Sequence, residues 1–259
     1  KEITSKFDIF NIPVSFKLKH SEKNKSFFIE LDSHDLRLNI KNKLNYINKE
    51  INGKMDFTFI NDKKKIDFNL IDNFLTFQTN DSEITGDVSI KPFFLRSKLN
   101  FYQIDLKKTF NNDSFLLNTL KSEIFNNENL NGKVNFEIEN FKNFNFLKEI
   151  KFNILFEEGN IYIQNFQANF KESVILNLNK AQLIFRENNA QILGDFFLEF
   201  IDIDTLYSHY QINKDYRKNY KNINIGFILD LDRNLVEINN LLIDNKTNKN
   251  IERLIKNLN

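Results

Sequence analysis

Apolar and polar residues alternate in short stretches along the whole chain. Residues 12–18, 134–138 and 150–154 are clear cases, and phenylalanine is the favoured apolar residue. A period of two places every apolar side chain on one face of a β-strand and every polar side chain on the other. A chain of many such strands forms a sheet with one apolar face and one polar face.

The alternating stretches recur at intervals of about 8 to 12 residues, which is typical of antiparallel meanders. We predict strands at residues 7–18, 27–32, 36–45, 54–60, 65–71, 74–79, 84–91, 97–102, 133–139, 150–157, 160–164, 166–171, 174–179, 181–186, 190–200, 222–231 and 235–243. The chain is therefore expected to be mainly β.

The connections between these strands are predicted from turn-forming residues. The pairs Asn52-Gly53 and Asn131-Gly132 predict two-residue hairpin turns, because Asn and Gly tolerate the positive φ that a type I′ turn needs. The six glycines each lie beside or within a strand-like run, which indicates a loosely repeated design without a fixed period. The lysine run 63–65 is interpreted as a solvated turn.

Three segments depart from the alternation and predict helices. Residues 104–125 and 247–258 carry apolar residues at helical spacing. Residues 202–219 predict a shorter helical stretch that Asp202 or Asp204 would cap. The helical segments 104–125 and 202–219 each follow a glycine-led strand, so we expect one elongated region built from two strand-to-helix units, 1–126 and 127–259.

Composition excludes several classes of function. The net charge is +1, with 36 basic and 35 acidic residues spread along the chain, which is unlike the basic footprint of a nucleic-acid-binding protein. Cysteine is absent, and His20, His34 and His209 are too far apart in sequence to predict a metal site. Neither a phosphate-binding glycine loop nor a serine-nucleophile elbow occurs, so we expect no enzyme and no cofactor.

Membrane insertion through a helix is not expected within this chain. No apolar run approaches the roughly 20 residues that a transmembrane helix needs. The chain begins at Lys1 without Met, and we expect it to be part of a longer protein. Any targeting or anchoring segment would then lie outside these residues.

A succession of motifs in the middle of the chain points to a known family. Gly86 opens a strand, Pro92-Phe93 follows it, and a further strand leads into Ile104-Asp105-Leu106. This succession resembles the AsmA-like family of bacterial envelope proteins. Residues 130–195, from Leu130-Asn131-Gly132 to Gly194-Asp195, resemble the C-terminal region of the same family.

The resemblance implies a fold and a function. It implies a large, curved, largely antiparallel sheet that forms a taco-like apolar groove, with a few short helices. It also implies a periplasmic location and a tether to the inner membrane outside this chain. Several members of the family are implicated in moving phospholipid toward the outer membrane. The expected function is therefore to bind or conduct lipid by sheltering phospholipid acyl chains. An envelope protein is a second expected partner.

The candidate groove-lining residues share one phase of the clearest predicted strands. They are Phe57, Phe59, Phe68, Leu70, Val88, Ile90, Phe101, Phe136, Ile138, Phe152, Ile154, Ile161 and Ile163.

Two alternatives stay open at this point. An exported β-sandwich or adhesin-like binding domain would bury the same apolar residues between two sheets about 10 Å apart. A scaffold for outer-membrane protein assembly would share the groove fold and would recruit a partner at a sheet edge or through the C-terminal helix.

Overall fold

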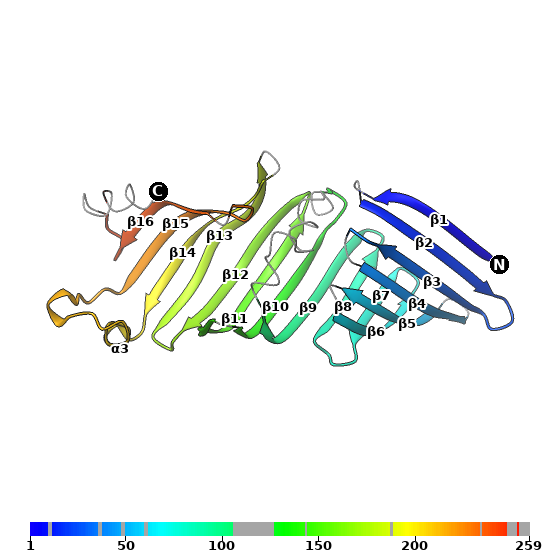
Figure 1. Cartoon of the computed structure of the whole chain (residues 1–259), viewed down its shortest axis with the longest axis horizontal. Coiled ribbons are helices and arrows are strands. Elements are labelled where there is room, and N and C mark those ends of the chain that lie inside the picture. Colours follow the sequence, from blue (N-terminus) through cyan, green and yellow to red (C-terminus); the bar gives the residue numbers. More distant parts are fainter. Residues whose placement is uncertain are drawn as a thin grey trace. The chain divides into compact units, whose positions relative to one another are not determined.

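A computed structural model of the chain gives one β-sheet of 16 strands (Figure 1). The structure describes residues 1–9, 12–35, 38–47, 50–59, 62–105, 127–142, 144–186, 189–233 and 235–247, together with Arg253. The strands lie in the sheet in their order along the chain, and β1 and β16 stand at the two ends of that order. The prediction of a mainly β fold with few helices is confirmed.

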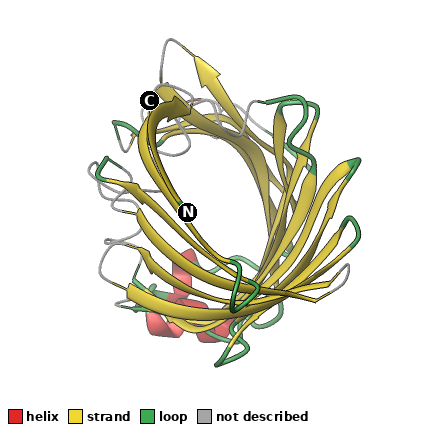
Figure 2. Cartoon of the chain, turned by 90° about the vertical axis from the view of Figure 1, so that its right-hand side faces the viewer, coloured by secondary structure: helices red, strands yellow, loops and turns green. Residues whose placement is uncertain are grey.

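The first eight strands are β1 (Glu2–Ile9), β2 (Ile12–Ser21), β3 (Ser26–Ser33), β4 (Leu38–Ile47), β5 (Glu50–Phe59), β6 (Asp62–Ile71), β7 (Phe74–Thr79) and β8 (Ile84–Ile90). The next eight are β9 (Phe93–Ile104), β10 (Gly132–Phe141), β11 (Phe144–Glu157), β12 (Asn160–Phe170), β13 (Val174–Arg186), β14 (Asn189–Phe200), β15 (Asn222–Asp230) and β16 (Leu235–Ile243). The individual strands are visibly curved and twisted (Figure 2), as strands of L-residues are.

The described chain divides into two compact units. The N-terminal unit comprises residues 1–100, 127–134 and 157–159, and the C-terminal unit comprises residues 101–105, 135–156 and 160–247, with the gaps given above. Each unit is a set of neighbouring strands with its own apolar side chains, and each is treated separately below.

Several predicted strands differ from the observed ones in their limits. The predicted strand 7–18 is a hairpin of β1 and β2, in which Ile9 pairs with Ile12. Conversely, β12 and β13 each join two predicted strands. A residue with positive φ marks each junction, Asn165 at 53° and Lys180 at 51°, and the β13–β14 register shifts at the second. Such local irregularities resemble bulges, which interrupt the alternation without ending the strand.

Both predicted Asn-Gly hairpin turns are wrong. Gly53 lies inside β5, where a Cβ atom would come within 2.1 Å of the Phe68 ring on β6. Gly132 begins β10, where a Cβ atom would lie 2.6 Å from the Leu95 carbonyl oxygen. Gly132 is needed because the backbone of a neighbouring strand approaches closely, whereas Gly53 makes room for the Phe68 ring; both are recognised roles of glycine in strands.

The strands β9 and β10 run parallel, unlike the antiparallel pairs from β1–β2 to β8–β9 and from β12–β13 to β15–β16. Near the starts of both strands, the Leu95 N–H donates to the Asn131 carbonyl at 2.9 Å. Near their ends, the Lys142 N–H donates to the Ile104 carbonyl at 2.8 Å. Two parallel neighbouring strands need a long connection between them. Most of the predicted helix 104–125 falls in this connection, outside the described residues.

The helical prediction for residues 202–219 is confirmed only in part. Helix α3 (Ile203–His209) and the short 3-10 turn η2 (Lys214–Tyr216) occupy this region. Asp202 is the N-cap, and its carboxylate accepts from the Thr205 N–H at 3.0 Å. No residue of α3 is buried. The predicted helix 247–258 lies outside the described residues except for Thr247 and Arg253.

Candidate binding surface

In the N-terminal unit, the strand register places the apolar side chains on one face of the sheet. Phe57 pairs with Ile40, and Phe68 pairs with Phe77. Leu70 pairs with Leu75, which in turn pairs with Val88. Ile90 pairs with Phe93. The predicted lining residues Phe57, Phe68, Leu70, Val88 and Ile90 therefore share this face. The side chain of Phe59, at the end of β5, lies outside the described part of the structure.

In the C-terminal unit, side-chain contacts join the predicted residues in the same way. Phe101 packs against the buried cluster that contains Ile138, and Phe136 stacks on Phe152 with ring centroids 4.6 Å apart. Ile154 follows Phe152 in the same phase. Ile161 and Ile163 pair with Leu183 and Ala181 on β13. We call the face that carries these side chains, in either unit, the apolar face.

The apolar face of the N-terminal unit is only partly covered. Of its described hydrophobic residues, only Ile12, Ile66 and Val134 are buried. Ile90 and Phe93 on this face remain 39% and 38% exposed. All the described strands belong to one sheet, so among these residues no second sheet lies against the face. The described chain is therefore not a two-sheet sandwich, whose inner faces would seal each other.

The C-terminal unit buries more of its described hydrophobic residues, and several of them lie on adjacent strands. The fully buried positions include Ala168 and Ala190, which are small and sit between larger neighbours. The cluster of Ile138, Ile150 and Ala168 joins β10, β11 and β12, which are adjacent in the sheet.

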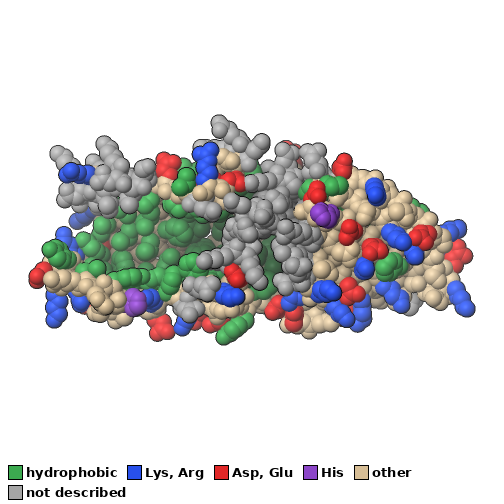
Figure 3. Space-filling view, viewed as in Figure 1, with side chains coloured by type: hydrophobic (Ala, Val, Ile, Leu, Met, Phe, Trp, Pro, Cys, Tyr) green, Lys and Arg blue, Asp and Glu red, His purple; other side chains and the backbone are tan. Residues whose placement is uncertain are grey.

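The apolar face over β13, β14 and β15 carries no polar side chain. By register it consists of Val174, Leu176, Leu178, Ala181, Leu183, Phe185, Ala190, Ile192, Gly194, Phe196, Leu198, Phe200, Ile223, Ile225, Phe227 and Leu229. Figure 3 shows hydrophobic side chains gathered in a hollow over these strands, with charged groups at its margins. The surface offers shape and hydrocarbon contact but no hydrogen-bonding group.

An ion cluster around Lys64 borders the apolar face of the N-terminal unit. Lys64 lies opposite Phe57, and its ammonium donates to Asp81 at 2.6 Å and also to Glu83. Burial lowers the pKa of Lys64, but the two carboxylates outweigh it and hold this pKa above its usual value. The lysine run 63–65 is part of β6, so its interpretation as a turn is wrong.

Asp81 is the most strongly perturbed acid of this cluster. The Lys64 ammonium holds the pKa of the Asp81 carboxyl well below its ordinary value of 3.8, and the Thr79 hydroxyl and the Glu83 N–H act in the same direction. Each of these groups donates to the carboxylate and so favours its charged form. The cluster satisfies its own charges, which makes it a polar border of the apolar face.

Aromatic residues border the opposite strand ends of the N-terminal unit. His20 stacks on Phe27 with ring centroids 4.5 Å apart, and the His20 Nε2 lies 3.3 Å from the Tyr46 hydroxyl. Polar groups thus stand at both ends of these strands, with the apolar residues between them. Sequence reasoning missed both borders because they depend on which residues the register brings together.

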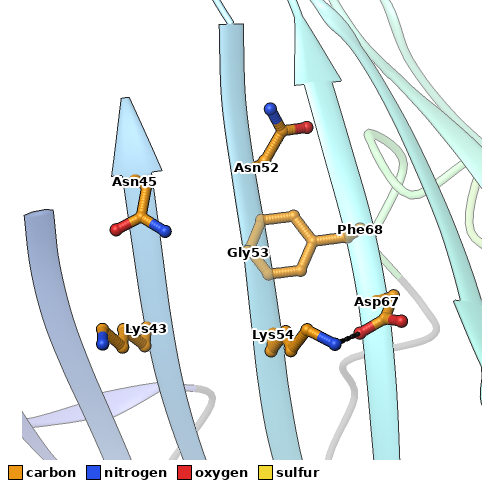
Figure 4. A pocket seen from close by; sticks show the side chains of 7 residues that line it. All are labelled: Lys43, Asn45, Asn52, Gly53, Lys54, Asp67 and Phe68. Carbon is orange, nitrogen blue, oxygen red and sulfur yellow. Dashed lines mark ion pairs between the residues drawn. The ribbon is translucent and has the colours of Figure 1, made fainter. Parts of the chain in front are cut away.

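A cavity of about 470 Å³ lies beside Gly53 (Figure 4). Its lining consists of Lys43, Asn45, Asn52, Gly53, Lys54, Asp67 and Phe68. Five of the seven belong to the polar face by register, and Lys54 pairs with Asp67 at 3.4 Å.

The described residues offer neither a metal-binding cluster nor a membrane-spanning helix. The described part of the chain contains no cluster of three or more His, Cys, Asp or Glu residues that would hold a metal ion. None of the described helices is long and apolar enough to cross a bilayer.

Comparisons with known proteins give no identification. No protein-family model, no curated protein and no solved structure matches the chain. The resemblance to the AsmA-like family therefore stays a prediction from the residues named above.

Proposed function

We propose that the apolar face binds acyl lipid, and that the chain is a lipid-binding or lipid-conducting segment of an AsmA-like envelope protein. The observation that carries this proposal is a single sheet whose apolar side chains are left half-buried among the described residues. Contiguous exposed apolar surface on a protein commonly marks a binding site.

The chemistry of the face favours a hydrocarbon occupant over a peptide. A peptide laid against β13–β15 would bring backbone N–H and C=O groups to a surface that has no polar side chain to pair with them. Each buried unpaired group would cost about 1 to 3 kcal/mol. An acyl chain has no such groups, and its polar head can remain in water at the margin of the face.

The energetics suit transfer of lipid rather than permanent storage. Moving an acyl chain of 16 carbons out of water is favourable by about 11 kcal/mol, at about 0.8 kcal/mol per methylene. A chain that leaves a bilayer for the apolar face exchanges one hydrocarbon environment for another, so the net change is small. Lipid can then enter and leave the face without a large change in free energy.

The cellular setting proposed here follows from the family resemblance. The segment would lie in the periplasm, tethered to the inner membrane through residues outside this chain, and would shelter phospholipid between the two membranes. Neither nucleic acid nor a cofactor belongs to the proposal.

Native mass spectrometry with lipid extraction tests the proposed function. The chain is purified from bacteria without detergent, and phospholipid is expected in stoichiometric amount. Phe152→Asp on the apolar face should lose this lipid, whereas Asn153→Asp on the opposite face of the same strand should retain it. A folded wild-type protein that carries no lipid and takes none up from phosphatidylethanolamine vesicles would contradict the proposal.

A further inference from the structure

Five phenylalanines form a row across the strands of the C-terminal unit. They are Phe136 on β10, Phe152 on β11, Phe166 on β12, Phe196 on β14 and Phe227 on β15. Successive ring centroids are 4.6, 6.1, 6.3 and 4.7 Å apart. Leu178 on β13 pairs with both Phe166 and Phe196 and so fills the one strand without a ring. We call this set the phenylalanine row.

The row presents usable surface along most of its length. Phe136, Phe152, Phe166 and Phe196 are half-buried, and only Phe227 at one end is buried, at 5% exposed. Small residues flank the row, since Ala181 and Gly194 share its face beside Leu178 and Phe196. The register places no charged side chain on this face of β13, β14 and β15.

The dimensions of the row match a long acyl chain. From β10 to β14 the partly exposed rings cross four strand spacings of about 4.8 Å, or about 19 Å, which is the extended length of about 16 carbons. Because the individual strands are curved (Figure 2), a straight chain keeps contact with the sheet by lying across them. Along a strand the same chain would have to bend.

We infer that one acyl chain lies across the strands over the phenylalanine row, with its length perpendicular to β10–β14. This inference rests on the proposed function and adds the position and direction of the hydrocarbon. The occupant is an uncharged alkyl chain, complementary to a surface without charge or hydrogen-bonding groups. The carboxyl or phosphate head lies beyond the row, in water.

Photocrosslinking on the unmodified protein tests the direction of the chain. Two palmitic acid derivatives are used, one with a diazirine next to the carboxyl group and one with it next to the methyl end. Peptide mapping should find the labels spread over several strands and close to the row positions. Labels confined to one strand and its neighbours, or placed away from the row on bound protein, would overturn the inference.

A matched pair of substitutions supplies a second readout. Phe196→Asp places a charge in the row, whereas Phe197→Asp places the same charge on the polar face, where Phe197 pairs with Asn177 and Asn224. Labelling by either palmitic acid derivative should fall at least tenfold in the first variant and stay within twofold of wild type in the second. Equal loss in both would overturn the inference.

The two proposals fail in different ways. If the wild-type chain binds no lipid in the mass spectrometer, the proposed function fails. If it binds lipid but the labels follow a single strand, only the position and direction inferred here are wrong.

Discussion

At the scale of single residues, the phase of the alternation was readable from sequence and the polar borders were not. Phe68 and Leu70 share one face because they lie two residues apart on the same strand, and this parity is a local property. Lys64 belongs to the same phase as its apolar neighbours on β6, yet it meets Asp81 and Glu83 from the β7–β8 turn. This contact depends on how the chain reverses at the β6–β7 and β7–β8 turns, and the alternation pattern does not specify these turns.

The Asp81 carboxylate makes a prediction for acid stability. Its pKa is depressed in the folded chain, so it contributes stability at neutral pH, and that contribution is lost progressively as the pH falls below 3.8 toward the folded-state pKa. Asp81→Asn should lower the thermal midpoint at pH 7, and its difference from wild type should shrink in acid. Thermal unfolding followed by circular dichroism across pH checks this; a difference that grows in acid would contradict it.

At the scale of elements, strand existence was predictable and strand pairing was not. The predicted segments at 74–79 and 235–243 coincide with β7 and β16. The parallel pairing of β9 with β10 was missed, because the Asn131-Gly132 pair carries the same local signal as a hairpin turn. Only the close approach of Leu95 to Gly132 explains why glycine is needed there.

Strand packing predicts unequal costs for two glycine substitutions. A Cβ on Gly86 would lie 2.4 Å from the Arg96 carbonyl oxygen on β9, whereas a Cβ on Gly53 would meet only ring atoms of Phe68. A ring can turn aside more readily than a backbone can move. Gly86→Ala should therefore lower the free energy of unfolding by about 3 kcal/mol and Gly53→Ala by about 1 kcal/mol. Urea denaturation measures both, and the opposite order would contradict this packing.

At the scale of the whole molecule, alternation predicted a two-faced sheet but left open what meets the apolar face. The strands of a sandwich and of a single-layer sheet share the same period of two, because the alternation shows only that one side of each strand is apolar. The described strands form one sheet, which decides between those two architectures. The resemblance to the AsmA-like family pointed to the single layer through motifs that periodicity alone does not contain.

The chain's lack of cysteine makes solvent access to the apolar face directly measurable. Leu198→Cys places one thiol on the apolar face of β14, and Glu199→Cys places one on the polar face of the same strand. Both variants are stripped of lipid, refolded and treated with a maleimide, with and without palmitic acid. We predict that both thiols react in the lipid-free protein and that palmitic acid protects only the Leu198→Cys thiol. A Leu198→Cys thiol that stays unreactive in the folded, lipid-free protein would contradict an open apolar face.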